Sequence, residues 1–419
     1  MNEEKISIFS YFKKLFQKSQ FIFYSLFIEK FAFFVFFIII ARLFSADIYG
    51  FIISIFAFVN ILIPLFDLGL PFYIHRERAS NNPLISEKIS NGLILKFYLF
   101  IPYIIAVTLY YFFTDSASFI PFAVISIAIY LFSLNHFLYR ILYGKNLYKT
   151  VFIFYSFGRG ILLGFAALGY FFDFSLNVIL TAVLVSSTIE FILLFKKIFD
   201  EEPLLNLRAI PDFKVLSDVL KSSTPMGIGL FFVLIYDRID IIFIENYIGA
   251  ASAGFYAAAY SIYKLPHALF GVILTPIYTD FSKMFGEKKF IPKKSFYNNF
   301  LFFILGSILS GMIIYFFSEE IIHITFGNEF VQSGKVLQLL LFSLPFILLN
   351  NLTGVTLNSM RLEKKGFITV ASGAAINIII IIFIIDRFGI YGAAAATIIT
   401  EAFIFLFQYY FIIRSQNLK

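Results

Sequence analysis

Cysteine and tryptophan are absent from this 419-residue sequence, and charged residues make up only 14% of it. The lack of cysteine excludes disulfides, thiolate metal ligands and cysteine nucleophiles. Because 60% of the residues are hydrophobic, there is too little polar surface to keep a domain of this length in solution. These shortages indicate that the chain is built for a lipid bilayer.

Sequence motifs of enzymes and nucleotide-driven pumps are also missing. The sequence contains no Gly-x-x-x-x-Gly-Lys-Ser/Thr loop, which argues against an ATP-driven pump, and no Gly-x-Ser-x-Gly or His-Glu-x-x-His motif. The formal net charge of +7 does not indicate a nucleic-acid surface, because the basic residues lie in short connectors between apolar runs. We therefore expect no enzyme, no cofactor or metal and no nucleic-acid partner.

Long apolar runs dominate what is present. A helix needs about 20 apolar residues to cross a bilayer, and by that measure the sequence predicts twelve spans in two sets of six. An aromatic content of 21%, chiefly phenylalanine and tyrosine, suits lipid-facing and interfacial surfaces. The expected spans lie near 21–44, 48–74, 92–113, 119–143, 150–172, 176–198, 222–248, 251–283, 296–317, 333–357, 366–385 and 389–413.

Charges in the connectors predict the orientation of these spans. If the N-terminus is cytoplasmic, the inner connectors and termini contain 25 Lys and Arg residues, whereas the outer connectors contain only Arg387. Cytoplasmic loops of membrane proteins carry such an excess of basic residues. The predicted fold class is therefore an all-α polytopic membrane protein of about twelve transmembrane helices, with both termini in the cytoplasm.

The longest inner connector divides the chain into two halves. We expect an N-terminal six-helix bundle over 1–198, a cytoplasmic linker over 199–221 and a C-terminal six-helix bundle over 222–419. The segment Arg42–Gly50 of the first half is echoed by Glu245–Gly254 of the second, about 204 residues later. With six spans per half, both copies enter the membrane from the same side, as in transporters built from parallel repeats.

Four basic residues fall deep inside the expected spans and form the candidate substrate-binding set. Lys30, Arg159 and Lys264 are each roughly 13–20 Å from the nearer helix end at 1.5 Å per residue, and Arg238 is closer to the outer side. A lone charge at such depth costs at least ~2.5–3.5 kcal/mol. These cations are expected to face a water-filled cavity between the bundles or to pair with a carboxylate, and Lys30 has Glu29 beside it. Three other cations, nearer helix ends, are expected to reach the headgroups: Arg42, Lys96 and Lys335.

Carboxylates inside the expected spans supply the candidate ion-coupling residues Asp237, Asp240 and Glu401. On a helix wheel Asp237 and Asp240 lie about 60° apart, so they share one half of the span 222–248 with Arg238. Such a half must turn away from lipid. Two interpretations of these charges remain open: salt bridges within the protein, or contact with a substrate or an ion.

Several short motifs, in order along nearly the whole chain, resemble the polysaccharide flippase family. This is the Wzx-type branch of the multidrug/oligosaccharidyl-lipid/polysaccharide exporter superfamily. Glycines in these motifs, such as Gly50, Gly254 and Gly392, are expected to pack helices closely rather than to bind ligands. The motifs are Ala41-Arg42-Leu43 with Tyr49-Gly50; Asp67-Leu68-Gly69-Leu70; Asp240 with Gly249, Gly254, Tyr256 and Ala258; Leu357-Asn358-Ser359-Met360; and Phe388-Gly389-Ile390-Tyr391-Gly392-Ala393-Ala394.

The resemblance implies a function. Such proteins move undecaprenyl-diphosphate-linked oligosaccharide repeat units from the cytoplasmic to the outer leaflet of the bacterial inner membrane, by alternating access, for O-antigen, capsule or exopolysaccharide synthesis. It further implies contact with membrane lipids, an H⁺ or Na⁺ gradient as driving force, and a polysaccharide polymerase and chain-length regulator as partners. Three alternatives stay open: an ion-coupled small-molecule exporter of the same superfamily, a membrane-embedded polymerase or glycosyltransferase, and a non-transporting scaffold.

Overall fold

The computed structural model describes residues 8–80, 83–113, 118–205, 213–288, 290–415 and 418. Over these residues the chain is almost entirely helical, and the β-structure consists of an isolated bridge between Ile291 and Leu418. The predicted all-α class is confirmed. The α-helices are α1 (Ile8–Leu43), α2 (Ala46–Asp67), α3 (Leu70–Ala79), α4 (Ile85–Phe113), α5 (Phe119–Gly144), α6 (Tyr148–Phe171), α7 (Leu176–Glu201), α8 (Phe213–Tyr247), α9 (Ala250–Lys288), α10 (Lys293–Phe316), α11 (Ser318–Phe326), α12 (Ser333–Leu340), α13 (Leu344–Ser359) and α14 (Glu363–Arg414), with 3-10 turns η1 (Asn328–Phe330) and η2 (Leu341–Ser343).

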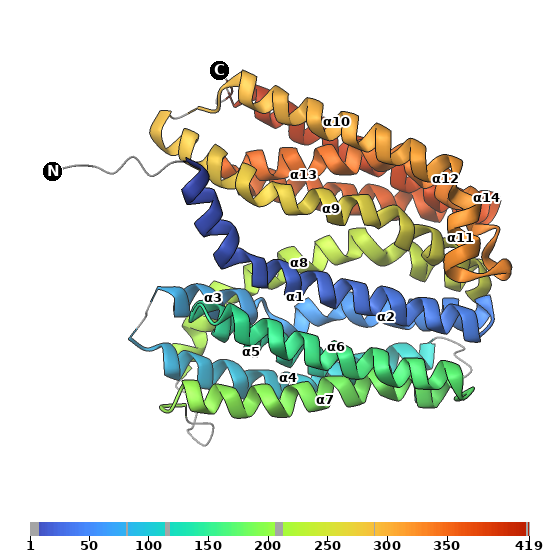
Figure 1. Ribbon diagram of the computed structural model, residues 1–419, viewed down its shortest axis with the longest axis horizontal. Helices are drawn as coiled ribbons and strands as arrows, with labels where there is room; N and C mark the ends of the chain where they lie inside the picture. Colours follow the sequence, from blue (N-terminus) through green and yellow to red (C-terminus); the bar gives the residue numbers. More distant parts are fainter. Residues whose placement is uncertain are drawn as a thin grey trace. The chain divides into compact units, whose positions relative to one another are not determined.

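Packing divides the chain into two compact units. Unit 1 comprises Met1–Leu43 and Leu62–Phe231, and unit 2 comprises Phe44–Ile61 and Phe232–Lys419. In unit 1, α1 packs against α6, while α5 lies against α3 and α7 (Figure 1, blue to green). In unit 2, α13 packs against α9, α10 and α14, and α12 packs against α9 (Figure 1, yellow to red).

Two helices belong to both units. The first part of α2 packs in unit 2 and its last part in unit 1, whereas α8 begins in unit 1 and ends in unit 2. Within the expected linker 199–221, α7 continues to Glu201 and α8 already begins at Phe213, and residues 206–212 lie outside the described part. The domain boundaries read from the sequence stay a prediction.

The apolar helices make the chain a multi-pass membrane protein. Among the described residues, eight helices are long and apolar enough to cross a membrane, or up to nine if the bent pair Ala250–Gly271 and Pro276–Glu287 forms one span. The 52-residue α14 covers two of the expected runs and kinks at Gly389, which has φ 55° and ψ −139°. A residue without Cβ adopts that conformation readily. The count of twelve spans and the cytoplasmic placement of both termini stay predictions.

The echoed segments of the two halves meet within unit 2. A methyl group added to Gly50 of α2 would overlap the carbonyl oxygen of Ala250, and one added to Gly254 of α9 would overlap that of Ala46. The N–H of Ala251 also donates to the Asp47 carboxylate at 3.2 Å. Gly50 and Gly254 are therefore packing residues, as expected. The residues that meet where α2 crosses α9 are 204 positions apart, which is the separation of the two echoed segments.

Candidate transport site

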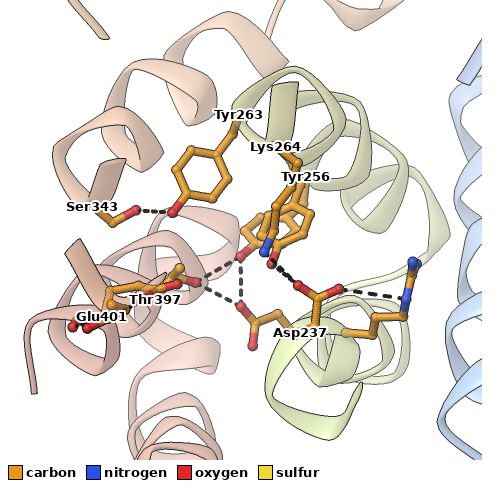
Figure 2. Close-up of polar contacts among 11 residues, drawn as sticks. Asp237, Tyr256, Tyr263, Lys264, Ser343, Thr397 and Glu401 are labelled. Atoms are coloured by element: carbon orange, nitrogen blue, oxygen red, sulfur yellow. Dashed lines mark hydrogen bonds and ion pairs between the residues drawn. The ribbon is translucent and has the colours of Figure 1, made fainter. Parts of the chain in front are cut away.

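Asp237 lies at the centre of a cluster of charged side chains on α8 and α9. Its Oδ1 atom accepts hydrogen bonds from Lys264 Nζ at 2.6 Å and Tyr260 OH at 3.1 Å (Figure 2). Arg238 Nε lies 3.9 Å from the Oδ2 atom. The side chains of Asp237, Arg238 and Lys264 keep 26%, 40% and 23% of their surface accessible. Two cations thus share one carboxylate, and all three side chains are partly accessible.

Asp240, one helical turn further along α8, is buried. Tyr256 OH and Thr397 Oγ1 both donate to its Oδ2 atom, at 2.7 Å and 2.9 Å (Figure 2). Its Oδ1 atom and the Oδ1 atom of Asn377 are buried without a hydrogen-bond partner among the described residues, although the Asn377 side chain approaches the carboxylate. Both hydroxyl donors thus meet at one oxygen of Asp240, and the Asn377 side chain lies near the carboxylate.

Glu401 is the third carboxylate of unit 2 and comes from α14. It is 2% exposed, and Asn350 Nδ2 donates to its Oε2 atom at 2.6 Å. Tyr236 also hydrogen-bonds to it, and Lys264 interacts with it electrostatically. Figure 2 shows Glu401 on the same side of the cluster as Thr397. Five of the seven candidate residues thus belong to one unit: Arg238, Lys264, Asp237, Asp240 and Glu401.

Arg159 lies in unit 1, where it forms a buried ion pair. Its Nη1 atom is 3.3 Å from Glu190 Oε2, with side-chain exposures of 3% and 0%. Tyr139 OH donates to the other carboxylate oxygen, and the Arg159 guanidinium lies 4.5 Å from the ring centre of Phe132. The Nε atom of Arg159 has no hydrogen-bond partner in the described part of the chain. Arg159 thus forms a salt bridge within the protein, as one of the two interpretations expects. Contact of Arg159 with a substrate stays a prediction.

Lys30 differs from the other candidates because it is exposed on α1. Its neighbour Glu29 is partly buried and interacts electrostatically with Arg159. No residue that the structure describes forms an ion pair with Lys30.

Lys96 contradicts its expected placement. Instead of reaching the headgroups it is fully buried in unit 1, where its Nζ atom bonds to the Asp67 carboxylate and to Ser133 Oγ at 2.6 Å. Ser133 Oγ also donates to Asp67 at 2.8 Å. The expectation failed because position along a helix gives depth in the bilayer but not the partner on the adjacent helix.

Uncharged partners of the carboxylates were missed by reasoning from charge. Tyr256, Tyr260 and Tyr263 recur at helical spacing on α9 and are buried or nearly so. A stripe of tyrosines inside an apolar span was the available signal, because a buried hydroxyl needs a hydrogen-bond partner. Ser343 of η2 extends the network by donating to Tyr263 OH at 2.7 Å. Among the residues described, no group of three or more His, Asp or Glu side chains is arranged to hold a metal ion.

Apolar helices long enough to cross a bilayer, with buried and paired charges between them, define a polytopic membrane protein. The chain belongs to the polysaccharide biosynthesis protein family, whose model matches residues 15–285. This confirms the resemblance read from the short motifs.

Solved structures show the same fold. The lipid II flippase MurJ, in an inward closed conformation, is 19% identical with a TM-score of 0.75, over 95% of this chain and 87% of that one. A multidrug resistance MATE family transporter of the MOP superfamily, in an inward-facing conformation, is 13% identical with a TM-score of 0.76, over 93% and 95%. These neighbours are transporters, not enzymes.

A curated relative is an uncharacterized membrane protein of Methanocaldococcus jannaschii. It is 28% identical over 102 residues, which are 24% of this chain and 20% of the relative. The match thus spans about a fifth of that protein's length.

Proposed function

We propose that this chain is a flippase that moves undecaprenyl-diphosphate-linked oligosaccharide repeat units from the cytoplasmic to the outer leaflet of a bacterial inner membrane. The observation that carries the proposal is the match of residues 15–285 to a polysaccharide biosynthesis family on a chain with a transporter fold. Alternating access moves the head of such a lipid across while its tail stays in the bilayer. The exported units serve O-antigen, capsule or exopolysaccharide synthesis, with a polymerase and a chain-length regulator acting afterwards.

The chemistry of the cations supports this cargo. A diphosphate that leaves the headgroup layer needs cationic partners, and arginine offers it a bidentate fork. Arg238 and Lys264 lie on either side of Asp237 and remain partly accessible. We assign the diphosphate to these two residues first. Arg159 and Lys30 are assigned supporting roles in unit 1.

Coupling to an ion gradient is assigned to the carboxylates Asp240, Asp237 and Glu401. Asp240 is the foremost of them, because it is buried with one oxygen that lacks a hydrogen-bond partner among the described residues. A proton or a sodium ion at that oxygen would remove the cost of an uncompensated buried charge. Asp237, already paired with Lys264, releases its lysine when it takes up a proton.

The decisive experiment is translocation of a lipid-linked oligosaccharide by purified protein in liposomes. We expect the wild type to expose the oligosaccharide to an external glycosidase, and Lys264→Gln to lose this activity. Lys335→Gln is the matched control, because Lys335 is an exposed lysine on α12 outside the cluster, and it should behave as the wild type.

Each alternative predicts a different result. Uptake of cationic drugs without movement of the glycolipid would identify a small-molecule exporter. Growth of the sugar chain from added donors would identify a polymerase or glycosyltransferase. A scaffold would show neither activity and would tolerate neutralisation of all the buried charges.

A further inference from the structure

Lys264 interacts with two carboxylates of unit 2 but is bonded to only one of them. Its Nζ atom lies 2.6 Å from Asp237 Oδ1, and it also interacts electrostatically with Glu401. In Figure 2 the lysine side chain lies between Asp237 on one side and Glu401 on the other. One ammonium group from α9 thus has a bonded carboxylate on α8 and a second carboxylate nearby on α14.

The two carboxylates differ in burial and in their counter-charges. Asp237 keeps 26% of its side-chain surface accessible and has both Lys264 and Arg238 beside it. Glu401 is 2% exposed, and its hydrogen-bond partners are uncharged. An ionised carboxylate in an apolar interior is costly without a cation. If Lys264 moves to Glu401, it leaves a carboxylate that keeps one cation and reaches one that has none.

The surroundings of Lys264 are polar between the two positions. Its Nζ atom lies 4.9 Å from the ring centre of Tyr260, which is within the range of cation–π attraction. Tyr263 interacts electrostatically with both carboxylates, and Tyr236 hydrogen-bonds to Glu401. Lysine has a flexible four-carbon stem, so rotation about its side-chain bonds displaces Nζ without any movement of α9.

We propose that Lys264 exchanges its ion pair with Asp237 for one with Glu401 during transport, and that this exchange controls how strongly the cluster binds a phosphate group. The inference rests on the proposed function and gives Glu401 a defined role in it. With Lys264 at Asp237, both Lys264 and Arg238 can reach a diphosphate. With Lys264 at the buried Glu401, only Arg238 remains.

Proton uptake by Asp237 drives the exchange. The proton binds to the Asp237 carboxylate and stays there, which breaks the ion pair with Lys264. The ammonium group keeps its own protons and forms the new ion pair with Glu401. One ion pair replaces another and one proton is bound, so release of the phosphate group is linked to the uptake of one positive charge.

The first test measures how fast the Lys264 amine of the purified protein is methylated by formaldehyde and a mild reductant, read by peptide mass spectrometry. In Asp237→Asn the amine should react about tenfold more slowly than in the wild type, if it then spends nine-tenths of its time at the buried Glu401. Without the exchange, loss of its partner frees the amine and the reaction becomes faster. Lys335, exposed on α12, is the internal control and should react equally in both proteins.

A pair of double variants separates the exchange from a general effect on folding. Either carboxylate alone can serve Lys264, so Asp237→Asn and Glu401→Gln should each lower the unfolding temperature only slightly. Asp237→Asn/Glu401→Gln leaves the lysine without a carboxylate, so the unfolding temperature should fall by more than the sum of the two single effects. Asp237→Asn/Glu320→Gln is the matched control, because Glu320 is exposed on α11, and it should behave like Asp237→Asn.

Faster methylation of Lys264 in Asp237→Asn than in the wild type, or equal unfolding temperatures of the two double variants, would overturn the exchange. That result leaves the proposed function intact if the wild type translocates the lipid-linked oligosaccharide. Slower methylation in Asp237→Asn, with a wild type that does not translocate this lipid, would support the exchange and overturn the proposed function.

Discussion

At the scale of single residues, the structure turns isolated intramembrane charges into pairs. The Arg159–Glu190 pair is buried, and the Lys96–Asp67 pair is nearly so. Transferring either partner alone into the apolar interior is costly, while the pair with its hydrogen bonds is tolerated. A variant that removes one charge of either buried pair therefore tests stability and function together, and only a double variant separates them.

The Arg159–Glu190 pair allows this separation. Arg159→Gln leaves Glu190 buried and uncompensated, so we expect about 3–5 kcal/mol of destabilisation and low abundance in the membrane. The double variant Arg159→Gln/Glu190→Gln should return to near wild-type abundance, measured by fluorescence size-exclusion of the tagged protein. If the double variant also regains translocation, Arg159 has no contact with substrate; if it folds but stays inactive, the substrate role is supported.

Unlike Arg159→Gln, the variant Asp240→Asn should leave abundance unchanged and affect only the coupling of transport to an ion gradient. In Asp240→Asn the amide oxygen still accepts from Tyr256 and Thr397, so these two hydrogen bonds of the buried site are retained. Abundance should therefore be preserved while the dependence of translocation on an imposed ion gradient disappears. Liposomes with separate Na⁺ and H⁺ gradients measure this dependence. A variant that remains gradient-driven would remove Asp240 from the coupling site, and Glu401→Gln is then the next variant to measure.

The sequence predicted which charges lie in the membrane but not how they pair. Depth along a helix follows from counting residues, so Arg159, Asp240 and Lys264 were predicted to lie inside spans. The partner depends on rotation of adjacent helices, which apolar composition alone leaves open. Lys96 shows the difference, because a position consistent with an exposed helix end is instead occupied by a fully buried lysine bonded to Asp67 and Ser133.

At the scale of helices, close approach of α2 and α9 depends on the absence of side chains. Gly50→Ala places a methyl group onto the carbonyl oxygen of Ala250, so the two helices must separate. We expect a loss of about 1–3 kcal/mol, as in overpacked cores, seen as a lower unfolding temperature of the purified protein. Gly160→Ala is the control, because that glycine has open space around it. Equal unfolding temperatures of the two variants would contradict the close crossing.

Helix breaks show how far the sequence predicts the elements. Apolar runs located the helices, but the run 48–74 was read as one span, whereas the chain turns at Leu68 and Gly69, both with positive φ. Only the motif Asp67-Leu68-Gly69-Leu70 pointed to a helix end there. A methyl group at Gly69 would contact the backbone oxygen of Ser223 on α8. The break is therefore explained by tertiary packing inside unit 1, which a local pattern of apolar residues does not report.

At the scale of the whole molecule, apolar composition predicted a multi-pass protein and the motifs predicted its family, and both are confirmed. The division into compact units was less accessible. α2 and α8 each pass from one unit to the other. Gly50 near the start of α2 packs against α9, whereas Gly69, just after α2, packs against α8. Sequence order alone assigns a helix to one half of the chain and gives no sign of such a crossing.

Orientation in the membrane can be measured directly, because a chain without cysteine reports a single introduced thiol without background. Ser175, Asn328 and Asp386 are exposed and lie in connectors predicted to face outside; Glu287 and Glu363 are exposed and predicted to face the cytoplasm. Cysteines at the first three positions should react with an impermeant maleimide in intact cells. Those at the last two should react only after permeabilisation, which also serves as the reactivity control.

The pattern of labelling identifies which span is wrong if the prediction fails. Complete inversion at all five positions would reverse the orientation while keeping the number of spans. Labelling at Glu287 alone in intact cells would mean that the bent pair Ala250–Gly271 and Pro276–Glu287 re-enters the side from which it came. Protection at Asp386 would show that the kink at Gly389 does not divide α14 into two spans. Because basic residues gather on alternate connectors throughout the chain, we expect none of these departures.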